Sequence, residues 1–178
     1  MQPSPSLALP HPVKLKDGTM VLIRKAGPED FPMLYLMFSS LSVETMFRRF
    51  RMSNTGLEAR DVQEILRLED PNVTSLIAIV RKDGKEQAGG EAHYVADSAG
   101  RLAEASVVIA EDLQNRGLGT ALLSDLVAQG RRQGLKSIFA HFDVDNKAII
   151  RVGQKAGFRL ALVEGRPDYS MIKAEIEL

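Results

Sequence analysis

Seven consecutive residues, Gln114-Asn115-Arg116-Gly117-Leu118-Gly119-Thr120, have the composition of a loop that binds phosphate. The apolar run 106–110 precedes them and the amphipathic segment 121–133 follows, which predicts a strand, a glycine turn and a helix start. The first turn of a helix has unpaired N–H groups and the positive end of the helix macrodipole. Because glycine has no side chain, an anion can approach this backbone closely. The segment is therefore predicted to bind phosphate through main-chain amides.

The spacing of the glycines excludes two common phosphate loops. A P-loop requires G-x-x-x-x-G-K-S/T, which does not occur in the chain. A dinucleotide loop requires G-x-G-x-x-G after an early strand, whereas here Leu122 occupies the third glycine position and the motif begins past residue 110. The remaining pattern, Q/R-x-x-G-x-G/A, is matched by Gln114, Gly117 and Gly119. It resembles the pyrophosphate loop of the GNAT superfamily of N-acetyltransferases.

Further segments extend this resemblance over residues 15–178. Asn146-Lys147-Ala148, followed by Gly157-Phe158, is similar to the second GNAT motif, N-x-A…G-F. The runs LSVETMFRRF at 41–50 and AEASV at 103–107 resemble segments of bacterial Pat-type protein lysine acetyltransferases. The resemblance implies an α/β fold, namely a single GNAT domain with a mixed, mainly antiparallel sheet flanked by helices. It also implies acetyl-CoA as the co-substrate.

Composition limits the classes of function. The 178 residues suit one domain, and 23 Lys plus Arg balance 23 Asp plus Glu, which argues against a dedicated nucleic-acid partner. The absence of cysteine excludes thiolate metal sites and a cysteine nucleophile, and three scattered histidines do not form a metal site. No apolar run approaches 18 residues, and the first residues lack the features of a signal peptide. We therefore expect no bound metal, no membrane segment and a cytoplasmic location.

The pattern of elements predicts one folded domain at 13–178 after a flexible, proline-rich tail at 1–12. Apolar alternation predicts strands and a period of 3.6 residues predicts helices, with Lys82-Asp83-Gly84-Lys85 as a hairpin turn. The expected strands are 20–25, 75–81, 87–95, 101–110, 136–144, 158–164 and 170–178. The expected helices are 31–40, 42–50, 57–68, the segment after the glycine loop, and 147–156. Three successive antiparallel strands thus lead into the loop.

Acetyl transfer to an amine requires a base, because a lysine amine with a pKa of about 10.4 is mostly protonated at neutral pH. Strand alternation places Glu104 on one face with Ser106, Val108 and Ala110. From this pattern alone, an ordinary solvated glutamate is the stronger interpretation of Glu104. The resemblance implies a catalytic role, since Glu104 occupies the position of the glutamate that is proposed as the base in Pat-type enzymes.

Three further positions leave the proton chemistry open. Glu91, on the preceding strand, is the alternative base, and His93 would lie about opposite Glu104 if the intervening turn is centred near residues 98–99. Many GNAT enzymes place a tyrosine four residues before the glycine of the G-F pair, as the acid for the leaving thiolate. Gly153 occupies this position here, as is common in the Pat-type group, so that acid stays unassigned.

The resemblance also implies which residues bind acetyl-CoA. Backbone groups of Val108, Ile109 and Ala110 would bind the pantetheine arm and polarise the acetyl carbonyl. Asn146 would reach the pantetheine or the adenine side, although a helix N-cap is a nearly equal interpretation. The pyrophosphate would lie on Gln114, Asn115, Arg116, Gly117, Leu118, Gly119 and Thr120.

These assignments predict an acetyl-CoA-dependent N-acetyltransferase that works by direct attack in a ternary complex, because the chain has no cysteine for an acyl-enzyme. The resemblance implies a lysine of a protein as the acceptor, and acetyl-CoA synthetase as a partner. Two alternatives stay open, an enzyme that acetylates a small amine and a non-catalytic acyl-CoA-binding module. Arg48 and Arg49 lie in the segment that borders the acceptor groove of GNAT folds, where a substrate role and a solvated basic face both remain open.

Overall fold

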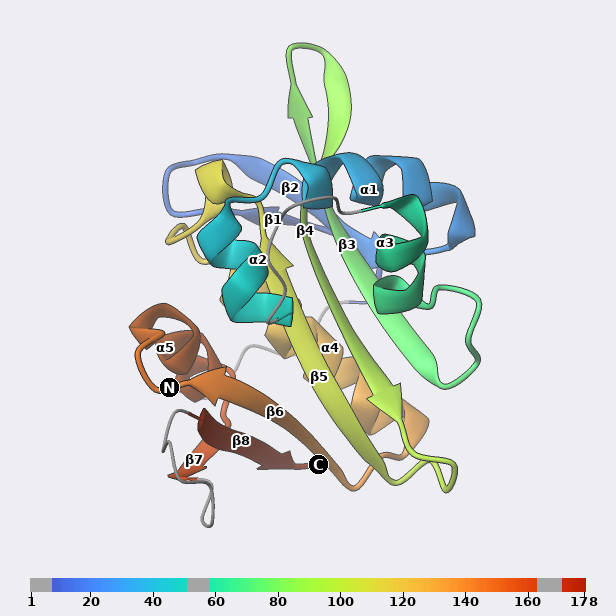
Figure 1. Ribbon diagram of the computed structural model, residues 1–178, viewed down its shortest axis with the longest axis vertical. Coiled ribbons are helices and arrows are strands. Elements are labelled where there is room, and N and C mark those ends of the chain that lie inside the picture. Colours follow the sequence, from blue (N-terminus) through green and yellow to red (C-terminus); the bar gives the residue numbers. More distant parts are fainter. Residues whose placement is uncertain (1–7, 51–57, 163–170) are drawn as a thin grey trace.

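An eight-stranded sheet forms the centre of the molecule. The computed structural model describes residues 8–50, 58–162 and 171–178, and the strand order is β1-β2-β3-β4-β5-β6-β8-β7 (Figure 1). Neighbouring strands are antiparallel except β5 and β6, which run parallel. This mixed, mainly antiparallel sheet confirms the predicted fold class. The strands are β1 His11–Lys14, β2 Met20–Lys25, β3 Val73–Lys82, β4 Lys85–Ala96, β5 Leu102–Ile109, β6 Ser137–Asp143, β7 Arg159–Leu162 and β8 Met171–Glu177.

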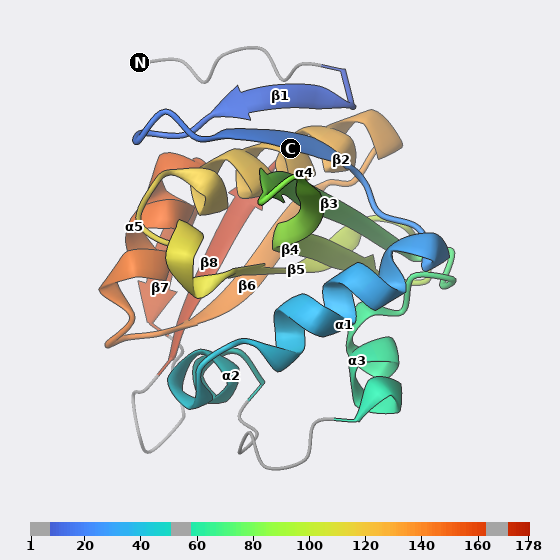
Figure 2. The ribbon, with the colours of Figure 1, turned by 90° about the horizontal axis from the view of Figure 1, so that it is seen from above.

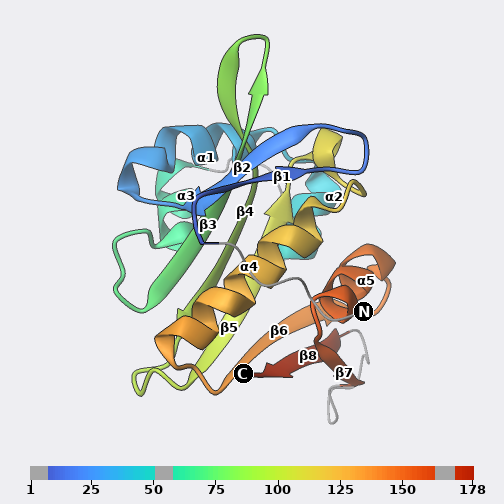
Figure 3. The same ribbon diagram turned by 180° about the vertical axis from the view of Figure 1, so that it is seen from behind.

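Helices cover both faces of the sheet. In Figure 2, α1, α2 and α3 lie on one side of the strands and α4 and α5 lie on the other, and Figure 3 shows α4 crossing the sheet. None of the helices in the described part of the chain has the length and apolar character needed to cross a bilayer. The helices are α1 Phe31–Ser39, α2 Val43–Phe50, α3 Ala59–Leu66, α4 Leu118–Gln133 and α5 Lys147–Lys155, with short 3-10 helices at Pro28–Asp30 (η1) and Glu111–Leu113 (η2).

Each face of the sheet has its own hydrophobic core. On the α4 face, Leu122 and Leu126 are fully buried against strand residues such as Ile23. On the α1–α3 face, Leu34 and Phe38 are fully buried in the second core. Two cores follow from strands that alternate between two covered faces, since successive side chains point to opposite sides of a sheet.

Strand β5 shows this alternation directly. Ala103 and Ala105 pack in the core under α4, whereas Val108 and Ala110 pack in the core under α1–α3. Glu104 lies on the same face as Val108 and Ala110, as the sequence predicted. The carboxylate and the helix that follows the glycine loop are therefore on opposite faces of the sheet.

The first strand was not predicted from the sequence. β1 begins at His11, inside the segment 1–12 that was expected to be a flexible tail, whose first seven residues lie outside the described part of the chain. His11 is buried, and its Nε2 lies 2.9 Å from Oδ2 of Asp125 in α4, which is also buried. The contact joins a buried polar pair across 114 positions of sequence, so no local apolar pattern could have indicated it.

The turn between β4 and β5 sets a register different from the predicted one. Val95, and not His93, is the partner of Glu104, while His93 pairs with Ser106. The turn is centred one residue later than expected, because the Asp97 N–H donates to the Leu102 carbonyl and the Asp97 carboxylate accepts from the N–H of Leu102 as well. The prediction that His93 lies opposite Glu104 is therefore wrong.

Strands β5 and β6 pair over a short length and then separate. Their parallel register covers three pairs, from Leu102 with Ser137 to Glu104 with Phe139. Beyond Glu104 the two strands diverge (Figure 1), so the sheet is split between its β1–β5 and β6–β8 parts. A split of this kind leaves backbone groups on both inner edges without a strand partner, and such groups need another ligand.

Candidate active site

A cleft of about 980 Å³ lies where β5 and β6 separate. Residues 105–109 of β5 form one wall and residues 140–143 of β6 form the other. The glycine loop, the first turn of α4 and the start of α5 close one end, and residues at the start of α2 border the opposite end. A ligand in this cleft can therefore contact residues from both faces of the sheet.

The β5 wall offers backbone groups to an extended ligand. The Ala110 N–H donates to the Gly89 carbonyl of β4 at 3.0 Å. Residues of an antiparallel ladder direct their backbone groups to alternate sides, so Val108 also faces β4 while Val107 and Ile109 face the cleft. The Ile109 carbonyl accepts a bond from Gln114 Nε2 at 3.1 Å. The neighbouring amides on this edge could bind an amide-bearing chain that takes the place of the missing strand.

The glycine loop leads directly into α4, which starts at Leu118 and not at 121 as the sequence suggested. Gly117 is the N-cap residue with φ of 97°, in the left-handed region that favours glycine, and no side chain caps this helix end. Leu118 is fully buried beneath the loop and anchors it. The first-turn amides of a sixteen-residue helix thus lie at the end of the cleft, where an anion can bind them.

The turn between β1 and β2 holds the glycine loop from outside. The Lys16 N–H donates to the Arg116 carbonyl at 3.1 Å, and the Arg116 guanidinium forms an ion pair with Asp17. Hydrogen bonds from Thr19, together with the Arg116 charge, hold the pKa of the Asp17 carboxyl below its usual value. The Lys16 side chain lines the cleft, with Cε 3.9 Å from the position that a Cβ on Gly117 would occupy. The turn therefore adds a cation to the anion site.

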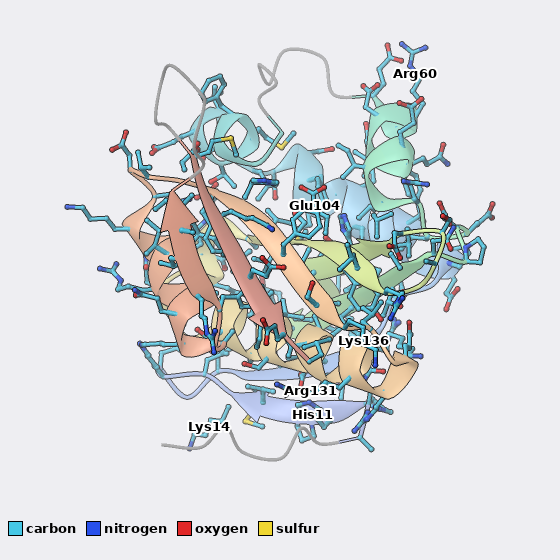
Figure 4. The ribbon with its side chains drawn as sticks, turned by 90° about the horizontal axis from the view of Figure 1, so that it is seen from below. His11, Lys14, Arg60, Glu104, Arg131 and Lys136 are labelled. Carbon is cyan, nitrogen blue, oxygen red and sulfur yellow. The ribbon has the colours of Figure 1, made fainter. Side chains whose placement is uncertain are left out.

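A carboxylate and an imidazole meet at the point where the strands part. Glu104 Oε1 lies 3.1 Å from Nδ1 of His141 on β6, and Figure 4 shows Glu104 on the side of the sheet that carries α1–α3. The Glu104 side chain is 57% exposed and does not border the cleft, whereas His141 does. The His141 ring packs against Phe139 in a T-shaped contact, with ring centroids 5.7 Å apart. This pair can accept a proton from a group that enters the cleft.

The start of α2 is tied to the entrance of the glycine loop. The Ser42 N–H donates to Glu111 Oε1 at 2.9 Å, and Gln114 Nε2 donates to the other oxygen of Glu111 at 3.1 Å. Burial raises the pKa of Glu111, but hydrogen bonds from Ser42, Thr45 and Gln114 outweigh burial and keep the pKa below its usual value. Glu111 is therefore a charged link between the α2 wall and the phosphate end of the cleft.

The model of the acetyltransferase (GNAT) family matches residues 41–158, more than half of the chain. The chain belongs to the GNAT family. As a member, it is an acetyl-CoA-dependent acetyltransferase, which agrees with a cleft that has an uncapped helix N-terminus at one end and a carboxylate–imidazole pair at its side.

Individual relatives place this GNAT domain near the Pat type, as its sequence motifs indicated. The chain is 28% identical over 137 residues to "Acetyltransferase PA5475" of Pseudomonas aeruginosa, covering 76% of this chain and 73% of that protein. It is 23% identical over 170 residues to "Acetyltransferase Pat" of Mycolicibacterium smegmatis, covering 95% of this chain but only 49% of Pat, so it spans about half of that relative. The GNAT domain of S. lividans PAT superposes with a TM-score of 0.80 at 22% identity, covering 95% of this chain and 97% of that domain.

Most of the residues expected to bind acetyl-CoA come together in this GNAT cleft. Three of the expected residues do not line it: Ala110, whose amide is bonded to Gly89, Arg116, which pairs with Asp17, and Leu118, which is buried. The expected residues that line the cleft are Val108, Ile109, Gln114, Asn115, Gly117, Gly119, Thr120 and Asn146. Asn146 also caps α5, since its Oδ1 accepts from the Ile149 N–H at 3.2 Å. Both interpretations of Asn146 thus fit the structure.

The alternative base, Glu91, lies away from the cleft. It is fully buried on the α1–α3 face, where Oε1 is 2.8 Å from Ser75 Oγ and 2.9 Å from His93 Nδ1. Its Oε2 has no hydrogen-bond partner among the described residues. Glu91 therefore belongs to a buried polar cluster within the domain, one strand away from Glu104.

Gly153 stands where many GNAT enzymes have a tyrosine, and the space beside it is occupied by a side chain from another element. A Cβ on Gly153 would lie only 2.6 Å from the ring of Phe142, which projects from β6. Because that aromatic ring occupies the space, no larger side chain fits at residue 153 without moving Phe142. The side chains of Arg48 and Arg49, expected near the acceptor groove, lie outside the described residues.

Lys16 was not singled out from the sequence, and its position predicts a role in cofactor affinity. Lys16→Ala should weaken coenzyme A binding roughly three- to tenfold, because it removes one exposed cation from the phosphate end of the cleft. The loss should shrink at high salt, where an exposed charge is screened. Calorimetry with coenzyme A at low and high ionic strength measures both effects.

Lys14→Ala is the matched control for this variant. Lys14 is an exposed lysine on the same hairpin, but it does not line the cleft. Equal losses of affinity in the two variants would attribute the effect to net charge and contradict a local role for Lys16.

Proposed function

We propose that this chain transfers the acetyl group of acetyl-CoA to a lysine side chain of a folded protein. The observation that carries the proposal is the arrangement of one cleft, with an uncapped helix N-terminus at one end and the Glu104–His141 pair at its side. The helix N-terminus suits the phosphates of the cofactor, and the Glu104–His141 pair suits removal of a proton from an amine.

In the proposed complex, the cofactor lies along β5. The pyrophosphate binds the loop 114–120 and the first-turn amides of α4, with Lys16 as an added cation. The pantetheine arm lies against residues 107–109, where the Val107 and Ile109 backbones face the cleft, and Asn146 borders the same path. An arm that bonds the open edge of β5 satisfies backbone groups that have no neighbouring strand where β6 departs.

The proposed reaction is direct attack of the amine on the thioester carbonyl. Glu104 is the carboxylate that makes proton removal favourable, since it lies at the split between the strands. A covalent acetyl-enzyme is not needed, and the chain contains no cysteine to form one. The nitrogen forms a bond to the carbonyl carbon, and the carbon–sulfur bond then breaks.

The proposed acceptor is a lysine of a protein, with acetyl-CoA synthetase as the first candidate. The Pat-like segment at 41–50 supports this choice, because residues 42, 44 and 45 of that segment border the acceptor side of the cleft. The exposed apolar side chains Val43 and Phe47 of α2 lie beside this border and offer contact area to a protein surface. Carboxylates at the cleft, Glu44 and Asp143, would also suit a small cationic amine, which is the alternative acceptor.

A side-by-side assay distinguishes these acceptors. The protein is incubated with acetyl-CoA and either folded acetyl-CoA synthetase, its isolated lysine peptide, or a panel of polyamines, aminoglycosides and amino acids. We expect the highest kcat/KM for the folded protein, with the acetylated lysine identified by mass spectrometry. A higher kcat/KM for any small amine would overturn the protein acceptor, and binding of acetyl-CoA without transfer to any acceptor would favour the non-catalytic module.

A further inference from the structure

His141, and not Glu104, is the member of the pair that reaches the cleft. Glu104 forms the last parallel contact of β5 with Phe139, and His141 is two residues further along β6. Side chains two residues apart on a strand share a face, so His141 and Phe139 lie on the side of Glu104, opposite α4. The imidazole borders the cleft while the carboxylate lies behind it and is 57% exposed. A group in the cleft therefore meets the ring first.

The contact with Glu104 determines which ring nitrogen can accept a proton. An ionised carboxylate only accepts hydrogen bonds, so Nδ1 of His141 must carry the proton in its 3.1 Å contact with Glu104 Oε1. In the neutral ring, Nε2 then has a free lone pair. Phe139 packs against the imidazole in a T-shaped contact, with ring planes at 78°. The pair thus presents a neutral imidazole with Nε2 as the proton acceptor.

Charged groups of both signs surround this ring. The carboxylates of Asp143 on β6 and Glu44 on α2 line the cleft that His141 borders, and so do the cations of Arg151 and Lys155 on α5. Lys173 of β8 is the cross-strand partner of His141, and its Nζ donates to Glu175 Oε2 at 2.9 Å. The lysine charge is therefore balanced by its own partner, while Glu104 faces the imidazole directly.

We propose that His141 is the catalytic residue that takes the proton from the acceptor amine, and that Glu104 is a positioning residue that orients and stabilises its imidazolium. This inference rests on the proposed function and names the proton path within it. The acceptor ammonium gives one proton to Nε2, and the neutral amine then attacks the thioester carbon. As the carbon–sulfur bond breaks, the second proton of the nitrogen ends on the sulfur, and the imidazolium releases the first to solvent. An imidazole, with a reference pKa of about 6.5 against about 4.3 for a glutamate, is the better matched base near neutral pH.

His141→Asn is the decisive variant. The asparagine Nδ2 can still donate to Glu104 in place of the ring Nδ1, but the variant has no nitrogen that accepts a proton. We expect kcat to fall by roughly 100-fold or more, with acetyl-CoA affinity unchanged. The kcat of the variant should rise about tenfold per pH unit toward the acceptor pKa of about 10.4, because only the neutral amine reacts. Wild-type rate and pH profile in His141→Asn would overturn the inference and leave Glu104 as the base.

A second measurement needs no acceptor. In Glu104→Gln, the ¹⁵N signals of the His141 ring should lose the pattern of a ring protonated on Nδ1, because the amide that replaces the carboxylate can donate to Nδ1 as well as accept from it. Glu177→Gln is the matched control, since Glu177 is an exposed residue on the same face of β8 but pairs opposite Ser137. If the ¹⁵N pattern of the His141 ring stayed unchanged in Glu104→Gln, the pairing would be overturned. Failure of the wild-type protein to acetylate any acceptor would instead overturn the proposed function, so the two failures are distinct.

Discussion

Gly117→Val is expected to reduce the affinity for coenzyme A by roughly 100-fold, the loss of one to two charge-assisted hydrogen bonds. Gly117 has φ of 97°, and a β-branched residue is strained in that region, so the loop must change its backbone. The amides that follow Gly117 would then no longer point together at the end of the cleft. Isothermal titration with coenzyme A measures the change, and thermal unfolding checks that the domain stays folded.

Two further variants separate cofactor binding from backbone strain. Gly84→Val introduces the same kind of strain at φ of 75° in the β3–β4 hairpin turn, where nothing lies within 4 Å, so it should leave affinity unchanged. Gly119 does not have a positive φ, and a Cβ there would lie 3.5 Å from Val152, in ordinary contact. Gly119→Val therefore adds side-chain bulk to the first turn of α4 without left-handed strain, and we expect it to weaken coenzyme A binding as well. Wild-type affinity in both loop variants would refute phosphate binding by this loop.

Glu104→Gln is expected to lower kcat by roughly 10²–10⁴-fold while acetyl-CoA affinity stays near that of the wild type. The glutamine keeps the size of the side chain but has no charge to favour proton removal at the split between β5 and β6. The cofactor path proposed along β5 does not include the Glu104 side chain, which is why binding should be spared. Steady-state kinetics and equilibrium binding on the same preparations give the two numbers.

Glu177→Gln serves as the control, because it removes one exposed carboxylate from the same face of the sheet. Its kcat should match the wild type. Near-full activity of Glu104→Gln between pH 6 and pH 9 would exclude Glu104 from proton transfer. The buried Glu91 would then be the next carboxylate to replace, even though it does not border the cleft.

The parts of the molecule that the sequence predicted are those encoded over short distances. The glycine loop, the three antiparallel strands before it and the alternation that places Glu104 with Val108 all follow from local periodicity and turn residues. The hairpin turn at 82–85 was also predicted, since Asp-Gly is a typical turn pair, and Asp83 and Gly84 both adopt positive φ there. Such features are predictable because the residues that cause them are neighbours in the sequence.

The features that the sequence missed depend on contacts between distant segments. His141 meets Glu104 through the parallel register of β5 and β6, across 37 positions, and no local pattern sets that register. Lys16 reaches the glycine loop because the hairpin of β1 and β2 folds back on Arg116, a contact across 99 positions at Asp17. The register of His93 was wrong for a smaller reason, since the side-chain bonds of Asp97 shift the turn by one residue.

Glu111 connects the two proposed binding regions, so the affinities for acetyl-CoA and for the acceptor are expected to be linked. One of its oxygens binds the first residue of the acceptor wall, Ser42, and the other binds Gln114 at the entrance of the phosphate loop. A ligand that steadies either end of this carboxylate restrains the other end as well. Because linkage between two binding sites is reciprocal, any factor by which bound acetyl-CoA tightens the acceptor must equal the factor by which the acceptor tightens acetyl-CoA. Such coupling would pass through one carboxylate that touches neither of the reacting atoms.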